Sequence, residues 1–134
     1  MAATLPEQLK KFIDEAKAFA TVATLLPDGQ PHLTVVWIKR DGEDLLFSTT
    51  AQRMQGRNLA RDPRITVMIN PPDDPYTYAA VRGAATLTPD PAGELADELS
   101  YKYTGQDFAS YLRGRADGDR VVVRVTPARV TGRF

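Results

Sequence analysis

Residues 47–64 read FSTTAQRMQGRNLARDPR, and this stretch contains the point at which a strand changes into a helix. Three hydroxyl residues end a strand-like run at Thr50, good helix formers follow from Ala51 to Asp62, and Asp-Pro is a typical helix stop. A helix N-terminus presents unpaired N–H groups and a partial positive charge, and hydroxyl and guanidinium groups add directional donors that match phosphate. The stretch is therefore the candidate anion site of this chain.

Three arginines follow the hydroxyls at four-residue spacing: Arg53, Arg57 and Arg61. Like charges at this spacing cost about 0.2–0.5 kcal/mol per pair in an isolated helix, and a bound anion or an acidic partner would remove that cost. A solvated basic face, with the hydroxyls capping the helix, explains the same spacing equally well. The chain has no G-x-G-x-x-G and no G-x-x-x-x-G-K-[ST] motif, so the two commonest glycine-loop nucleotide sites are excluded.

The residues before this stretch predict a β-meander. Strand-like runs at 19–26, 31–40 and 45–50 are separated by two turns that contain Asp-Gly. In the middle run both faces are apolar, because Leu33, Val35 and Trp37 alternate with Val36 and Ile38. Burial on both sides indicates a barrel or an interface.

The rest of the chain continues in the same style. We expect helices within 5–16, from Glu94 through Tyr103, and at 108–113. We expect strands at 65–70, 76–87, 121–126 and 128–133, the last two separated by an interruption at Pro127. Residues 71–75 are expected to form an exposed proline loop. Six or seven strands with helices inserted between them, and no strand-helix-strand rhythm, favour an α+β, mainly β antiparallel barrel. A length of 134 residues predicts one domain, residues 1–134.

Composition narrows the function classes. Seventeen basic and seventeen acidic residues balance, so we expect neither nucleic acid nor a membrane surface as partner. The chain has no cysteine and a single histidine, His32, which leaves no disulfide, no thiolate catalysis and no expected metal site. Without a leader pattern or an apolar run of about 18 residues, the expected location is the cytoplasm.

Four segments match, in their order along the chain, motifs of a known family. They are DGQPH at 28–32, VVW at 35–37, FSTT at 47–50 and RNLARDPR at 57–64. Together they resemble the pyridoxamine 5′-phosphate oxidase-like split β-barrel proteins, from about Phe12 to the last strand. The RNLxxDPR segment is the most specific part. Within the superfamily the chain is most similar to short actinobacterial-type proteins that bind coenzyme F420, an 8-hydroxy-5-deazaflavin, instead of FMN.

The resemblance implies a split β-barrel homodimer with two cofactors at the subunit interface. It implies an F420-dependent oxidoreductase that transfers a hydride between the reduced deazaflavin and an electron-poor small-molecule substrate. The phosphate would lie at the strand-to-helix segment, the ring against the central strands, and two tyrosines of the partner chain would close the site. The positions carried over to the cofactor are Val35, Val36, Trp37, Ser48, Thr49, Thr50, Arg53, Met54, Gln55, Arg57, Asn58, Tyr76 and Tyr78.

Two departures from the family pattern change what the resemblance implies. The family usually has lysine where this chain has Gln55, and the loss of that cation weakens phosphate binding by about 1 kcal/mol. The oxidase itself has substrate-phosphate residues near its C-terminus, where this sequence reads TGRF at 131–134, so we expect no vitamin B6 oxidase activity. No side chain is assigned as a catalytic acid or base; Tyr76 and Tyr78 are more typical of packing or stacking.

Two other functions remain open at the level of the sequence. One is an FMN-dependent flavin or haem-handling protein on the same barrel, which the copurifying cofactor would distinguish. The other is a non-catalytic carrier that binds a cofactor without turning over a substrate. The sequence does not name the substrate, and quinones, enones and bilins all fit the expected chemistry.

Overall fold

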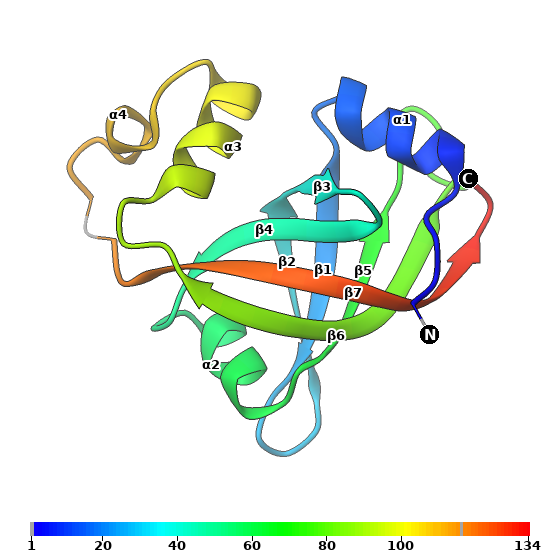
Figure 1. Ribbon diagram of the computed structural model, residues 1–134, viewed down its shortest axis with the longest axis horizontal. Helices are drawn as coiled ribbons and strands as arrows, with labels where there is room; N and C mark the ends of the chain where they lie inside the picture. The colour runs from blue at the N-terminus through cyan, green and yellow to red at the C-terminus, as the bar shows by residue number, and fades with distance from the viewer. Residues whose placement is uncertain (1, 116) are drawn as a thin grey trace.

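A computed structural model describes residues 2–115 and 117–134, and within them seven antiparallel strands form one sheet that curls into a half-barrel (Figure 1). The strand order is β2-β1-β5-β6-β7-β4-β3. The strands are β1 (Phe19–Leu25), β2 (Pro31–Trp37), β3 (Lys39–Asp41), β4 (Asp44–Thr50), β5 (Arg64–Ile69), β6 (Ala79–Pro89) and β7 (Arg120–Gly132). The helices are α1 (Glu7–Glu15), α2 (Met54–Arg61), α3 (Glu94–Thr104) and α4 (Phe108–Leu112). The predicted split β-barrel is confirmed.

The expected strand over 31–40 is divided at Ile38, which corrects the prediction. β2 pairs with β1 at one edge of the sheet and β3 pairs with β4 at the other, so the chain crosses between the two edges at this residue. The Ile38 N–H donates to the hydroxyl of Tyr103 in α3 at 3.1 Å instead of to a neighbouring strand. A distant side chain therefore satisfies the backbone at the crossing.

The core lies inside the curled sheet, on the alternate positions of the strands. Its largest fully buried side chain is Phe47, and α1 covers one end of the core with Leu9 and Ile13. The fully buried residues around them include Val22, Ile38, Leu45, Val67, Ile69, Val81, Val123 and Val125. Complete burial of one such side chain contributes about 1.5–3 kcal/mol relative to exposure, so this cluster is the main stabilising feature of the barrel.

The expected interruption at Pro127 was wrong, because β7 continues through it to Gly132. The pairing of β6 with β7 shifts register between Arg82 and Gly83, and Pro127 lies opposite Gly83 at this irregularity. A side-chain carbon on Gly83 would stand 2.1 Å from the carbonyl oxygen of Thr126, so only glycine fits there. Bulges are the places where a sheet accommodates proline, which has no N–H for the ladder.

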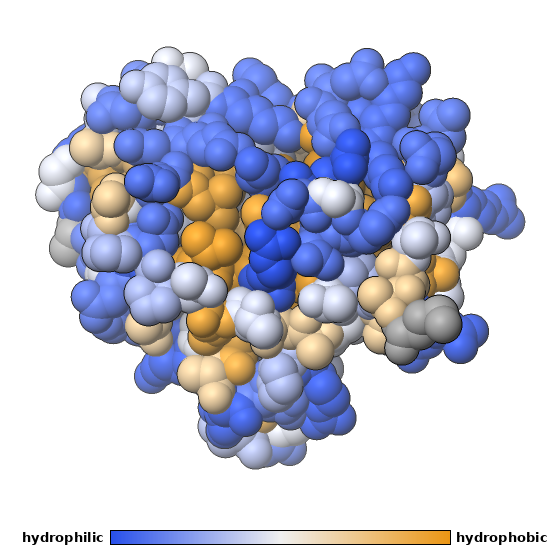
Figure 2. Space-filling model, viewed as in Figure 1, coloured by the Kyte–Doolittle hydropathy of each residue, from blue (hydrophilic) through white to orange (hydrophobic). Residues whose placement is uncertain are grey.

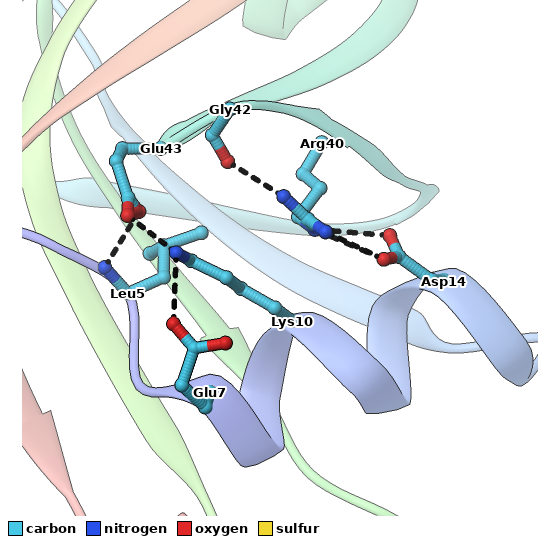
Figure 3. A network of polar contacts seen from close by, with 7 residues as sticks. All are labelled: Leu5, Glu7, Lys10, Asp14, Arg40, Gly42 and Glu43. Atoms are coloured by element: carbon cyan, nitrogen blue, oxygen red, sulfur yellow. Dashed lines mark hydrogen bonds and ion pairs between the residues drawn. The ribbon is translucent and has the colours of Figure 1, made fainter.

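α1 is attached to the β3–β4 hairpin by a network of charges (Figure 3). Glu43 accepts hydrogen bonds from the Leu5 N–H at 3.1 Å and forms an ion pair with Lys10 at 2.5 Å. Arg40 forms an ion pair with Asp14 at 2.7 Å. The Lys10 ammonium, followed by the Leu5 N–H, lowers the pKa of Glu43.

In the view of Figure 1, α3 and α4 lie together at the upper left and α1 lies at the upper right, while α2 covers the lower end of the barrel. Asp90 begins α3 by accepting hydrogen bonds from the N–H groups of Glu94 and Leu95, at 3.0 and 3.1 Å. The expected helix is confirmed, and its Leu95, Leu99 and Tyr103 form a small second core with Leu46 of β4. None of the helices in the described residues is long and apolar enough to span a membrane.

Candidate functional site

A pocket of about 320 Å³ lies between the sheet and the α3–α4 pair. β1, β2 and β4 form one wall, the residue before α2 and the first residue of β7 form one end, and the two helices form the opposite wall. Its lining residues are Phe19, Val35, Val36, Trp37, Ser48, Arg53, Ala96, Leu99, Phe108, Tyr111, Leu112, Arg115 and Arg120. Five of the predicted cofactor residues therefore share this pocket with side chains that the sequence did not single out.

The three hydroxyls at the end of β4 occupy different environments because successive side chains of a strand point to opposite faces. Ser48 lines the pocket. Thr49 is completely buried, and its hydroxyl has no hydrogen-bond partner among residues 2–115 and 117–134. Thr50 is also buried, and its hydroxyl accepts from the Arg53 N–H at 3.1 Å. Of the three residues, Ser48 is the one that lines the pocket, and cofactor contacts by the two threonines stay predictions.

The predicted helix over 51–62 begins later, at Met54. The Ala51 N–H donates to the carbonyl oxygen of Asp119 at 2.9 Å, which extends the pairing of β4 with β7 and postpones the helix. Gly56 then lets α2 approach the end of β4, since a side-chain carbon there would stand 2.1 Å from the Thr50 carbonyl oxygen. The start of α2 is thereby held close to the strand end that lines the pocket.

The three arginines, Arg53 just before α2 and Arg57 and Arg61 within it, lie in three different environments. Arg53 lines the pocket, and in the described part of the chain its guanidinium donates no hydrogen bond. Arg57 points elsewhere, with its guanidinium 3.7 Å from the sulfur of Met54. Arg61 donates to the Leu25 carbonyl oxygen and to Asn58 Oδ1. Of the three, Arg53 is the cation available to a ligand in this pocket.

Gln55 and Asn58 lie on the buried side of α2. The Gln55 amide donates to Thr34 Oγ1 at 3.2 Å, and the Asn58 amide donates to Thr24 Oγ1 at 3.0 Å. Gln55 is only 7% exposed, and neither residue lines the pocket. These bonds connect α2 to β1 and β2, so the role that the structure gives the two amides is to hold the helix in place; their assignment to the cofactor stays a prediction.

The β2 wall is apolar and partly open. Val36 is buried, whereas Val35 is 65% exposed. The indole of Trp37 stacks on Tyr103 with ring centres 5.4 Å apart and meets Tyr111 edge-on at 5.0 Å. Offset and edge-to-face contacts of this kind contribute about 0.5–1.5 kcal/mol each beyond burial. Trp37 therefore has a fixed orientation at the junction of β2 with α3 and α4.

The wall formed by α4 was missed at the level of the sequence. Phe108, Tyr111 and Leu112 line the pocket from positions i, i+3 and i+4, the spacing of one helical face, and Arg115 lines it from just beyond the end of α4. That spacing was the available signal, and it was obscured because α4 itself is only five residues long. Arg115 donates to the Leu112 and Tyr111 carbonyl oxygens at 2.8 and 3.1 Å, so it closes the end of α4.

Arg120, the first residue of β7, was also missed. Its guanidinium forms two hydrogen bonds of 2.7 Å to Asp117, stands 3.3 Å from Ser48 Oγ and lies 4.3 Å from the centre of the Phe108 ring. The lining described for the pocket contains three guanidinium groups, from Arg53, Arg115 and Arg120, and no carboxylate, and Asp117 compensates only the charge of Arg120. Its electrostatic character is positive, which suits an anionic ligand.

Tyr76 and Tyr78 lie in the segment between β5 and β6, outside the pocket. Tyr76 is 83% exposed, and the expected strand over 76–87 begins only at Ala79. Several apolar side chains of the sheet are also exposed: Phe19, Leu33, Val35 and Met68. On the face seen in Figure 2, a band of hydrophobic surface runs from below α3 toward α2, bordered by hydrophilic side chains.

The curled antiparallel sheet, with a short helix after β4 and a positive pocket beside it, defines a split β-barrel protein. The chain belongs to the pyridoxamine 5′-phosphate oxidase family, whose model matches residues 5–134. Among solved structures it is similar to an F420 reductase, with 30% identity, a TM-score of 0.77, and coverage of 95% of this chain and 98% of that one. It is also similar to a conserved hypothetical protein from Mycobacterium tuberculosis, with 26% identity, a TM-score of 0.73 and coverage of 96% and 84%.

Proposed function

We propose that this protein is an oxidoreductase that binds a phosphate-bearing flavin-type cofactor in the pocket, with coenzyme F420 as the first candidate and FMN as the alternative. The observation that carries the proposal is the pairing of an available guanidinium, Arg53, and a hydroxyl, Ser48, with the apolar wall of Val35, Val36 and Trp37 in one pocket. The similarity to an F420 reductase favours the deazaflavin over FMN.

The residues present fit such a cofactor. A planar ring requires an apolar surface, which β2 supplies, and a phosphate requires charged and neutral donors, which Arg53 and Ser48 supply at the end of β4. The N-terminus of α2 adds the positive end of its dipole at the same place. The lysine of the family pattern is absent, and Gln55 does not replace it because its amide is bonded to Thr34.

The chemistry follows from what the lining residues can do. A bound flavin or deazaflavin supplies the hydride-transferring ring, and the protein supplies position, electrostatics and exclusion of water. Among the described lining residues there is no histidine and no carboxylic acid, so this chain offers no strong acid or base beside the ring. Val36, Trp37 and the α4 side chains exclude water, while Arg53 and Ser48 hold the anionic end.

We further propose that a second copy of this chain covers the exposed apolar side chains of the sheet. Leu33 and Val35 lie on the edge strand β2, and Phe19 and Met68 lie on the neighbouring β1 and β5. Contiguous exposed apolar surface on a sheet is typical of an interface. In such a dimer Tyr76 and Tyr78 would be available to close the partner's pocket, because both side chains lie in an exposed connection.

The first experiment is a side-by-side titration of the purified protein with F420 and with FMN by fluorescence polarisation, with the mass in solution measured in the same buffer. Selective F420 binding by a dimer supports the proposal and justifies a substrate screen with reduced F420. Preference for FMN changes the assignment to a flavoprotein. Tight binding without reduction or reoxidation of the ring in that screen indicates a carrier, and binding of neither cofactor refutes the proposed function.

A further inference from the structure

The Arg120 guanidinium is the most buried charge in the pocket lining. Arg120 is 9% exposed, at the point where β7 begins and pairs with Thr50 of β4. A buried cation is costly unless an opposite charge and hydrogen bonds compensate it. Asp117 supplies both, with one carboxylate oxygen on Nε and the other on Nη2, each at 2.7 Å.

The bidentate pair determines where the third nitrogen points. Because Nε and Nη2 are both engaged by Asp117, the planar guanidinium directs Nη1 away from the carboxylate, and Nη1 lies 3.3 Å from Ser48 Oγ. The ring of Phe108 packs against the guanidinium at 4.3 Å and limits its rotation. The orientation of Arg120 toward Ser48 is therefore fixed from two sides.

The contact with Arg120 changes what the Ser48 hydroxyl can do. A hydroxyl has one proton to donate and lone pairs that accept, and Arg120 can only donate. When Ser48 Oγ accepts from the guanidinium, its own proton is free for another acceptor, and hydrogen bonds in such a chain strengthen one another. Ser48 lines the pocket together with Arg53, so the acceptor that suits this proton is an anionic oxygen of a ligand.

We propose that Arg120 is a positioning residue that, held by Asp117, makes the Ser48 hydroxyl a hydrogen-bond donor to an anionic oxygen of the ligand. The anion site itself rests on the contacts above. Which molecule supplies the anionic oxygen rests on the proposed function. The phosphate ester of the cofactor and a carboxylate of the substrate both carry such an oxygen. Nothing in the sequence pattern or the family comparison assigns this role to Arg120 or Asp117.

The test uses inorganic phosphate as the probe, in an NMR titration of the full chain. We expect Arg120→Met and Ser48→Ala each to weaken phosphate binding about tenfold, the effect of losing one charge-assisted or charge-polarised hydrogen bond. If Arg120 acts through Ser48, the variant with both substitutions loses no more phosphate affinity than Ser48→Ala alone. Arg124→Met is the matched control, because Arg124 lies on the same strand and pairs with Asp41 and Asp44 away from the pocket.

A conservative variant separates orientation from charge. Arg120→Lys keeps the charge but lacks the planar fork that engages Asp117 and Ser48 together, so we expect it to resemble Arg120→Met. Recovery of wild-type binding by lysine, additive losses in the double variant, or no phosphate binding by the wild type would each overturn the inference. Ser48→Ala provides an independent test if the Arg120 variants fail to fold, since unchanged phosphate affinity in that variant also overturns it.

The source of the anion is decided with the better-bound cofactor and its dephosphorylated form, for example FMN and riboflavin. If the anion is the cofactor phosphate, Arg120→Met lowers the ratio of the two affinities about tenfold, a quantity that general destabilisation does not change. If the ratio is unchanged while inorganic phosphate binding is weakened, the site stands and the anion belongs to the substrate. Failure of the wild type to bind either cofactor refutes the proposed function and leaves the phosphate titration valid.

Discussion

The hydroxyl oxygen of Tyr103 lies 3.1 Å from the amide nitrogen of Ile38 and 3.1 Å from the carbonyl oxygen of the same residue. The same hydroxyl donates to the Ala18 carbonyl oxygen. One side chain of α3 thus contacts the backbone where β2 ends and the backbone just before β1 begins. Because Tyr103 also stacks on Trp37, this contact places the α3–α4 pair over the pocket.

Tyr103→Phe should lower the free energy of unfolding by about 2 kcal/mol, because it leaves buried backbone groups of Ile38 and Ala18 without their partner. Urea denaturation of the two proteins measures the difference. Tyr101→Phe is the control, since Tyr101 lies on the same helix with its side chain exposed. Equal losses in both variants would contradict the role given to the hydroxyl.

Gly56→Ala should destabilise the protein by about 1–3 kcal/mol, the cost of overpacking at a tight contact. Helix propensity alone predicts the opposite sign, a gain of about 1 kcal/mol from alanine within a helix. The added carbon would stand 2.1 Å from the Thr50 carbonyl oxygen and would force α2 away from β4. The sign of the change in thermal midpoint distinguishes the two expectations, and a stabilised variant would show that α2 does not approach β4 this closely.

Arg53→Ala should weaken cofactor binding by about 2 kcal/mol if its guanidinium pairs with the phosphate. Arg57→Ala is the matched control four residues further along the chain, because Arg57 contacts Met54 and lies outside the pocket lining. Titration of both variants with F420 and FMN gives the comparison. The assignment of the phosphate to Arg53 is wrong if the two variants bind equally well.

Gln55→Lys restores the usual family residue, and we expect it to tighten phosphate binding while lowering the stability of the ligand-free protein. The first effect comes from the added charge. The second comes from the loss of the hydrogen bond to Thr34 at a position only 7% exposed, which costs about 1 kcal/mol. Cofactor titration and thermal unfolding without ligand measure the two effects; weaker binding would count against the alignment of Gln55 with the lysine.

Glu43 should make the attachment of α1 sensitive to acid. Its pKa is lowered by Lys10 and by the Leu5 N–H, so its contribution to stability is present above the ordinary carboxyl pKa of 4.5 and is lost as the pH falls through the lowered folded value. The wild type should therefore have a higher unfolding midpoint than Glu43→Gln at pH 7. This difference should disappear as the pH falls below about 4.5. A difference that stays constant from pH 7 to pH 3 would show that the charge of Glu43 is unimportant.

Much of the site could be predicted because it lies on a continuous segment. Ser48 and Arg53 are five residues apart at a strand-to-helix junction, and hydroxyls and arginine in that pattern indicate an anion site without knowledge of the rest of the fold. The same reasoning wrongly grouped all three arginines into one environment. Arg57 and Arg61 share the spacing of Arg53, but their surroundings come from Met54 and from the end of β1, which periodicity does not describe.

Four features could be predicted from the residues alone: the alternation of the strands, the Asp-Gly turns, the stop at Asp62-Pro63 and the family segments from residue 28 to residue 64. These features depend on neighbours a few residues apart. Three other features became visible only in the folded chain: the crossing between sheet edges at Ile38, the continuation of β7 through Pro127, and the contact of Arg120 with Ser48, 72 residues away in the chain. Such contacts depend on how the sheet closes and which buried polar groups need partners, and these are properties of the whole packed chain.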